Sequence, residues 1–215
     1  RVGRAVPLTP EQLSRRIETT LGYKWTDTLR YTGKSLLDDE SWHLIIYGGI
    51  DSDDITQRSL EPSAAMQNIA RNMSAEMACI SVALDFSYED PTQRKLFRLI
   101  EPATVPGNEE DDAKIRETIR YLHLRLLGEV LPDDSEEVDA TLELFESAMA
   151  AGLAVSENPG QRLDPLCEAR RTWVGRTNFN DVDGRSHVNT DDYGTINGWI
   201  AVITYLLSDY EFLYE

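Results

Sequence analysis

The sequence predicts a mainly α-helical protein that folds as a single bundle-like domain, residues 1–215, with long loops and little β structure. Apolar residues recur at spacings of three and four over several long stretches, and N-capping residues precede some of them. Only one short run, residues 43–50, has the apolar character of a buried strand. With 215 residues and 41% hydrophobic content, the chain can bury a substantial core.

The first predicted helix begins after Thr9. Thr9 is an N-cap residue, Pro10 suits the first helical position, and Gln12 completes a capping box with Thr9. Gly22 indicates the C-terminus of this helix, because glycine adopts the left-handed conformation that ends many helices. The face expected to pack inward carries Leu13, Ile17 and Leu21.

The next segments are predicted to alternate between extended and helical structure. Residues 23–42 are polar, with one short helix expected over 25–31, and residues 43–50 (HLIIYGGI) indicate a strand or a buried extended segment. Residues 61–86 carry the longest helical pattern, and residues 92–100 indicate another short helix. The apolar face of the longest helix contains Met66, Ile69, Met73, Met77, Ile80 and Leu84.

The second half of the chain predicts three further helices. Residues 103–112 contain a polar loop, which would be the boundary if the domain divided into two subdomains. Amphipathic helices are expected over 113–128 and 138–152, and their short connection favours an antiparallel hairpin. Residues 156–189 are rich in loop-forming residues, and an apolar helix over 193–208 closes the pattern.

The charge and hydropathy of the chain argue against two classes of partner. Lys and Arg number 21 against 38 Asp and Glu, which gives a net charge of −17. Nucleic acids are bound by basic surfaces, so we expect no nucleic-acid partner. No apolar run approaches the roughly 20 residues that a membrane-spanning helix needs, so we expect no membrane-spanning segment.

Two cysteines, Cys79 and Cys167, leave two alternatives open. They form a disulfide, or they are two buried thiols that pack as small hydrophobic side chains. Neither lies in a CxxC or CxxCH motif, so the sequence supports neither dithiol redox chemistry nor c-type haem attachment. The chain begins at Arg1 rather than at Met, so either a leader was removed or the sequence was trimmed, and export cannot be read directly from it.

Residues 181–192 predict a Ca²⁺ site, because oxygen ligands can be placed there on the template of an EF-hand loop. Asp181 takes the first ligand position and Asp183 the third. His187 supplies a backbone carbonyl at the seventh position. Asn189 takes the ninth position and Asp192 the twelfth.

This Ca²⁺ loop departs from its template at three positions. Arg185 stands where a ligand belongs, Ser186 replaces the glycine of the sharp turn, and Asp192 is shorter than the usual bidentate Glu. The alternative is a solvated loop whose Asp and Asn side chains cap turns and the last helix.

A second metal site is suggested by the acidic residues that follow the 43–50 segment. Asp51 and Asp53 come directly after an apolar run, and the alternative is that an acidic residue here caps a following turn. No HExxH, GxSxG or P-loop motif is present. An enzyme would therefore be a metal- or carboxylate-dependent hydrolase that uses Asp51, Asp53 or the 181–192 loop.

Two segments at the ends of the chain resemble a known family. Residues 4–13 (RAVPLTPEQL), followed by Leu21-Gly22, and residues 205–215 (YLLSDYEFLYE) are similar to the two ends of planctomycete-type secreted helical proteins of unknown function. Genes for those proteins are often fused to, or lie beside, genes for c-type cytochromes. The resemblance implies export to the periplasm or the cell exterior, and association with an electron-transfer or surface assembly.

These observations favour a non-catalytic, exported accessory or interaction subunit of a larger extracytoplasmic assembly, with a structural Ca²⁺. Its partners would be other protein subunits, c-type cytochromes among them. The alternatives are the hydrolase described above and a scaffold for a c-type cytochrome.

Overall fold

The protein is mainly helical in the computed structural model, which confirms the predicted fold class. The structure describes residues 6–26, 35–37, 42–50, 57–58, 61–155, 162–169 and 184–215. Their helices are α1 (Pro10–Leu21), α2 (Trp42–Ile46), α3 (Ala64–Phe86), α4 (Glu109–Leu127), α5 (Glu136–Val155), α6 (Thr195–Ser208) and α7 (Tyr210–Leu213). Two 3₁₀ turns are also present, η1 (Pro91–Gln93) and η2 (Pro165–Cys167). The described residues contain isolated β-bridges and no strand.

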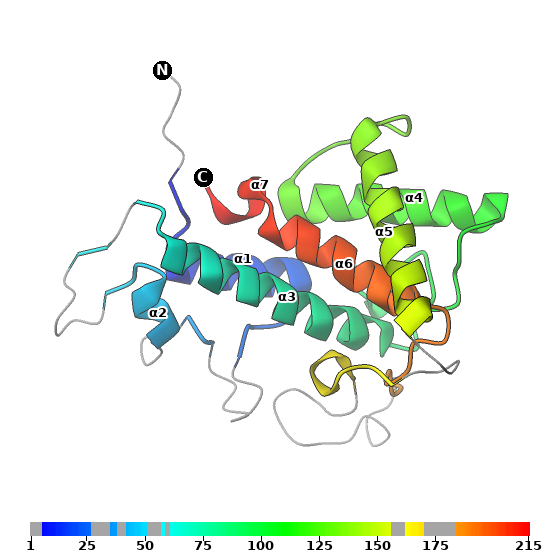
Figure 1. Cartoon of the computed structure of the whole chain (residues 1–215), viewed down its shortest axis with the longest axis horizontal. Coiled ribbons are helices and arrows are strands. Elements are labelled where there is room, and N and C mark those ends of the chain that lie inside the picture. The colour runs from blue at the N-terminus through cyan, green and yellow to red at the C-terminus, as the bar shows by residue number, and fades with distance from the viewer. Residues whose placement is uncertain are drawn as a thin grey trace.

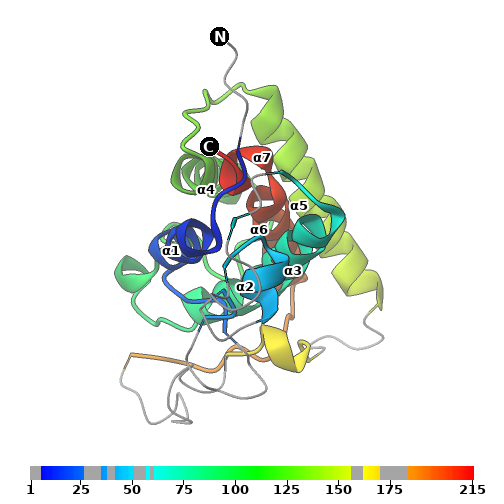
Figure 2. The same ribbon diagram turned by 90° about the vertical axis from the view of Figure 1, so that its left-hand side faces the viewer.

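Helix α6 lies at the centre of the bundle and packs chiefly against α3 and α5 (Figures 1 and 2). It is apolar over most of its surface, as expected for a helix covered on several sides. Gly198 permits the close approach of α5, because a Cβ at this position would lie 2.7 Å from the Phe145 ring and 3.0 Å from the Phe145 carbonyl oxygen. The central position of α6 therefore depends on a residue without a side chain.

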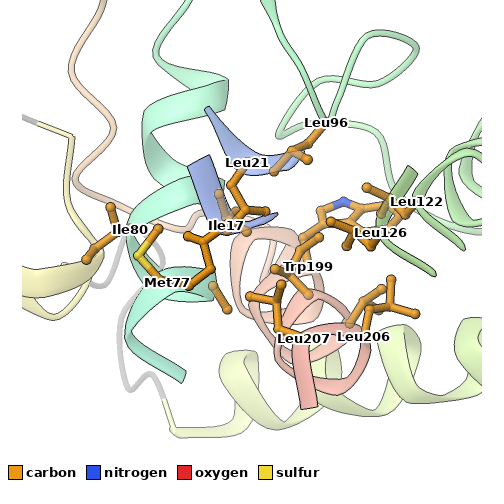
Figure 3. Packing of buried hydrophobic residues seen from close by; sticks show 14 of the residues in the cluster. Ile17, Leu21, Met77, Ile80, Leu96, Leu122, Leu126, Trp199, Leu206 and Leu207 are labelled. Atoms are coloured by element: carbon orange, nitrogen blue, oxygen red, sulfur yellow. The ribbon is translucent and has the colours of Figure 1, made fainter. Parts of the chain in front are cut away.

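The hydrophobic core draws side chains from α1, α3, α4 and α6 (Figure 3). Trp199 of α6 is fully buried, and its ring centroid lies 5.3 Å from that of Phe97 and 4.4 Å from that of Phe145. One continuous cluster includes residues on both sides of the 103–112 loop, among them Met77 and Leu122. Packing of this kind couples the two halves of the chain.

The first helix has the predicted caps. The Thr9 hydroxyl accepts the Gln12 backbone N–H at 3.3 Å, and the Gln12 side chain accepts the Thr9 backbone N–H at 2.8 Å. Gly22 ends the helix with φ of 91°. The predicted inward residues of α1 are all fully buried. Those of α3 are all buried, with at most 5% of any side chain exposed.

The first described residues, 6–8, lie beside the C-terminal residues 213–215 (Figures 1 and 2). Pro7 and Tyr214 form an antiparallel bridge, and Val6 and Glu215 exchange two backbone hydrogen bonds of 3.0 Å. The guanidinium of Arg16 donates to the carbonyl oxygen of Phe212 at 2.8 Å. Helix α7 is thereby fastened to α1.

The prediction of an extended segment over residues 43–50 is wrong, because this segment forms α2 and its C-terminal turn. Gly49 N–H donates to Leu44 O at 2.8 Å and Gly48 N–H donates to Ile45 O at 3.0 Å, with Gly48 at φ of 93°. This pair of bonds is a Schellman motif, so the two glycines end a helix rather than follow a strand. Leu44 and Tyr47 are buried at a spacing of three, which is the periodicity of a helix.

The predicted helix over residues 92–100 is also wrong beyond the short turn η1. The fully buried Asp85 carboxylate accepts backbone N–H groups from Lys95, Leu96 and Phe97 at 2.7, 3.0 and 2.9 Å. These amides are therefore bonded to a side chain of α3. Burial raises the pKa of Asp85, while the three N–H donors act in the opposite direction. The expected helix over 25–31 falls mostly outside the described residues.

Helices α4 and α5 are longer than predicted. Helix α4 begins at Glu109, where Asn108 caps it by accepting the Asp111 N–H at 2.9 Å. Helix α5 continues past Gly152, where a Cβ would lie 3.0 Å from the Asn197 side chain. Gly152 thus allows close packing on α6 and does not end the helix. Helix α5 crosses α4 steeply in both views, so the predicted antiparallel hairpin is not formed (Figures 1 and 2).

Candidate functional site

Residues 184–193 form a segment that lines the first of two clefts from residue 186 onward, and its Asp191 also lines the second. The segment pairs with the end of α3 through the bridge between Tyr88 and Arg185, and Val188 and Ala169 exchange hydrogen bonds of 3.0 and 2.7 Å. Leu163 N–H also donates to Asn189 O at 2.9 Å. The backbone of this segment is therefore held on both sides.

A disulfide between Cys79 of α3 and Cys167 of η2 fixes the position of residues 162–169. The structure thus has the bridged form of the two alternatives. The bond joins residues 88 positions apart and fastens a loop segment to a core helix. A covalent link over a separation of this size chiefly restricts the unfolded chain.

Asp191 caps α6 and lines both clefts. Its carboxylate accepts the backbone N–H groups of Ile196 and Asn197 at 3.2 and 2.9 Å, and the Asn197 side-chain amide at 2.8 Å. Asp191 is buried, so these bonds compensate the carboxylate for its lost hydration. The alternative role proposed for acidic residues here, capping of the last helix, is confirmed for Asp191.

Arg185 anchors the start of this segment to the end of α3. Its guanidinium donates to Leu84 O at 2.9 Å and to Ser87 Oγ at 2.5 Å. The guanidinium carbon lies 3.2 Å from the centroid of the Tyr88 ring, a cation–π contact. Arg185 occupies the position that departs most from the EF-hand template, and it is used here for packing.

The predicted Ca²⁺ ligands are only partly described. His187, Asn189 and Asp192 line the same cleft, whereas Asp181 and Asp183 lie outside the described residues. Asp51 and Asp53, the second predicted metal site, also lie outside them. Among the residues that the structure describes, no three His, Cys, Asp or Glu side chains are grouped to hold a metal. The Ca²⁺ site stays a prediction.

The first cleft, which we call the acidic cleft, has a volume of about 450 Å³. It opens between the loops after α3 and the segment 186–193. Its carboxylates are Glu89, Glu101, Asp191 and Asp192, its aromatic residues are Phe86, Tyr88 and Tyr193, and its other apolar residues are Pro102, Val188 and Ile196. Acidic, aromatic and apolar groups thus converge on one concave surface.

Arg94 shapes the floor of the acidic cleft. It is 3% exposed and donates to the carbonyl oxygens of Tyr88 and Ile100 at 2.9 and 3.0 Å. Its guanidinium also lies 2.8 Å from the Glu101 carboxylate, so Glu101 is neutralised locally. The carboxylates of Glu89 and Asp192 make no hydrogen bond or ion pair with any described residue.

The second cleft shares the lining residue Asp191 with the acidic cleft and also measures about 450 Å³. It is bounded by Ala148, Ala151 and Gly152 of α5, Arg162, Leu163, Asp164 and Cys167 of the η2 segment, and Asp191 and Asn197. Three exposed apolar residues line these clefts or are next in sequence to residues that do: Tyr193 lines the acidic cleft, Leu153 follows Gly152 in the chain, and Leu166 precedes Cys167. We call these three residues the apolar rim.

A third arrangement, which the sequence did not predict, joins His123 of α4 to Glu129 and Thr141. His123 Nδ1 lies 2.8 Å from Glu129 Oε2, and His123 Nε2 lies 3.1 Å from Thr141 Oγ1. This order of groups resembles a hydrolase triad. His123 and Thr141 are each 1% exposed, however, and neither lines the two clefts.

We therefore interpret the His123 arrangement as a buried polar contact that holds α4 against α5. No motif marks it, because Glu129 and Thr141 lie 6 and 18 residues from His123. The one available signal was the position of His123 between leucines on an amphipathic helix, which predicts a place at the edge of the core.

No helix in the described part of the chain is long and apolar enough to cross a membrane. In comparisons with known proteins, no family model matches the chain, and no curated protein or solved structure matches it either.

Proposed function

We propose that this protein is a non-catalytic, exported accessory subunit that binds another protein in a larger extracytoplasmic assembly. The observation that carries this proposal is the apolar rim beside the two clefts. Leu153, Leu166 and Tyr193 are 44%, 40% and 48% exposed. Exposed apolar side chains at or next to concave surfaces are typical of protein-binding sites.

The surroundings of the apolar rim support a binding role because they are held in place before a partner arrives. The disulfide fastens η2 to α3, and Asp191 fastens the segment 184–193 to α6. A surface that is already ordered loses less conformational entropy when it binds. The same disulfide supports export, because structural disulfides persist chiefly in oxidising compartments.

The proposal includes two ligands, a structural Ca²⁺ ion and a c-type cytochrome partner. A structural Ca²⁺ in the 181–192 loop would use Asp181, Asp183, the His187 carbonyl, Asn189 and Asp192. A c-type cytochrome is the class of partner that the family resemblance implies. The net charge of −17 supports a basic partner, because opposite charges accelerate and orient association.

Native mass spectrometry of the protein isolated gently from its source would test the proposed function. We expect the wild-type chain to retain a defined partner subunit, and the double substitution Leu153→Ser/Leu166→Ser to lose it. The matched control is Leu124→Ser/Val130→Ser, which removes two exposed apolar side chains elsewhere. A bare monomer for the wild type, or equal loss of the partner in both variants, would contradict the proposal.

The alternative function, a metal- or carboxylate-dependent hydrolase, depends on Asp51, Asp53 or the 181–192 loop. It stays a prediction, because Asp51, Asp53, Asp181 and Asp183 lie outside the described residues. Measured hydrolysis of an ester or glycoside that is lost in Asp51→Ala or Asp181→Ala would favour the hydrolase over the accessory subunit.

A further inference from the structure

We propose that the acidic cleft binds an arginine side chain of the partner protein. This inference rests on the proposed function, since it names the chemistry by which the partner is recognised. Asp192 is also a ligand of the proposed Ca²⁺ site, so the inference is stated for, and tested on, the protein in EDTA.

Two carboxylates of the acidic cleft are available to a ligand. Glu101 is already paired with Arg94, and Asp191 already caps α6. Glu89 and Asp192 are exposed, and their carboxylates have no partner among the described residues. They lie 103 positions apart in the sequence, 192 − 89, yet they line one cleft. Unpaired acids in a concave site focus the electrostatic field and favour a cation.

Tyr193 adds an aromatic surface beside these acids. Its side chain is 48% exposed and lines the cleft. The other cleft tyrosine, Tyr88, already carries the Arg185 guanidinium 3.2 Å from its ring centroid. A guanidinium can stack on an aromatic face while it donates hydrogen bonds to a carboxylate. The carboxylates of Glu89 and Asp192 and the ring of Tyr193 therefore suit a guanidinium group.

The protein already holds two of its own guanidinium groups with the same kinds of contact in this region. Arg185 stacks on Tyr88, and Arg94 pairs with Glu101 at 2.8 Å while its guanidinium carbon lies 5.6 Å from the Phe86 ring centroid. The cleft volume of about 450 Å³ lies within the range of ordinary ligand sites.

Arginine fits this site better than lysine. The planar guanidinium can pair with a carboxylate in a fork and stack on a ring, whereas the ammonium of lysine acts as a compact, strongly hydrated charge. The apolar residues Pro102, Val188 and Ile196 would accommodate the methylene stem. The occupant we infer is an arginine presented on the surface of a basic partner.

NMR titration of the whole chain in EDTA with three blocked tripeptides tests this inference. The tripeptides are Ac-Gly-Arg-Gly-NH₂, the lysine equivalent, and the equivalent with neutral citrulline. We expect the arginine peptide to shift amide signals of residues 88–89 and 186–193, the lysine peptide to bind more weakly, and the citrulline peptide to produce no saturable shift. Free spermidine is a further arm, which tests whether a small amine is preferred over a protein side chain.

Two variants of cleft residues and one control variant test whether the arginine peptide binds in the acidic cleft. Glu89→Gln/Asp192→Asn should weaken binding of the arginine peptide about tenfold, as expected for the loss of two partly exposed ion pairs. Glu143→Gln/Glu146→Gln makes the same change in net charge on the exposed face of α5 and should leave binding unchanged. Tyr193→Leu keeps the charge and should reduce arginine binding more than lysine binding, because it removes the ring.

Four results would overturn this inference: equal shifts with arginine and citrulline, tighter binding of spermidine, shifts outside the cleft, or equal weakening in the two charge variants. The proposed function is judged separately. If the wild type retains its partner and Leu153→Ser/Leu166→Ser loses it while the arginine peptide does not bind, only the arginine inference fails. If the wild type has no partner in native mass spectrometry, the proposed function fails whatever the peptide does.

Discussion

Cys79, on a helix of the core, is bonded to Cys167, in the loop segment that forms one side of the second cleft. This single bond links the stability of the fold to the geometry of the candidate binding surface. Because Ala169 pairs with Val188 just beyond the disulfide, a change at Cys167 should also be felt in the segment 184–193.

Removal of the disulfide should destabilise the protein. We expect Cys79→Ala/Cys167→Ala to lower the free energy of unfolding by about 2–4 kcal/mol, because the unfolded chain regains the entropy of a long open loop. Urea denaturation of the variant and the wild type measures this. The intact mass should rise by about 2 Da on reduction, since two hydrogens are added. Labelling of two free thiols in the native, unreduced protein would contradict the bond.

Loss of the Thr141 hydroxyl should leave a buried histidine nitrogen without its partner. Thr141→Val is therefore expected to lower the free energy of unfolding by about 1–3 kcal/mol, whereas Thr141→Ser should stay close to the wild type. Thr118→Val is the matched control, because the equally buried Thr118 hydroxyl bonds only to the carbonyl of Lys114 in its own helix. Equal losses in the two valine variants would show that burial, not the bond to His123, sets the cost.

The ion pair between Glu11 and Arg58 should contribute stability that disappears in acid. Two hydrogen bonds of 2.7 Å from the Arg58 side chain lower the pKa of Glu11 from 4.5 to about 2. Because the folded pKa lies below the unfolded value, the contribution is full above pH 4.5 and is lost as the pH falls toward 2.

The measurement for this ion pair is the stability difference between the wild type and Glu11→Gln as a function of pH. We expect a difference of less than about 1 kcal/mol at pH 6, because both side chains are partly exposed. It should shrink as the pH falls below 4.5 and be largely lost near pH 2, where folded Glu11 is itself becoming protonated. Glu146→Gln, a surface acid on α5, provides the control. A difference that does not change between pH 6 and pH 2 would show that the bond, and not the charge, is responsible.

Removal of Ca²⁺ should lower the melting temperature if the 181–192 loop binds the ion. Ligands that bind only the folded state stabilise it by mass action. Chelation with EDTA should lower the melting temperature of the wild type, and Asp181→Ala should abolish that response. Thermal unfolding with and without added Ca²⁺ measures both effects. An unchanged melting curve in EDTA would contradict Ca²⁺ binding.

Several elements could be predicted because their signals are local. The Thr9, Gln12 and Gly22 caps of α1 act within a few residues of the backbone groups that they satisfy. The apolar stripes of α3 and α4 have a period that follows from helix geometry alone. The mainly helical fold and the inward faces of these helices could therefore be predicted without knowing which other helices they pack against.

The candidate site could not be assembled in the same way. Glu89 and Asp192 carry no shared motif, and the acidic cleft exists only because the end of α3 pairs with the segment 184–193. His187, Asn189 and Asp192 were predicted as metal ligands from their spacing along the chain. Glu89, Glu101 and Tyr88 line the same cleft, but they lie far from the 181–192 loop in the sequence, so its spacing could not predict them.

The sequence by itself determined the mainly helical fold, the caps of α1 and the inward faces of α1 and α3. The tertiary structure decided the conformation of residues 92–100, whose amides are held by Asp85, and the central place of α6, where Gly198 admits Phe145. It also decided the clefts. The physical reason is that capping and helical periodicity act over a few residues, whereas a buried carboxylate or a close helix contact depends on groups that only folding brings together.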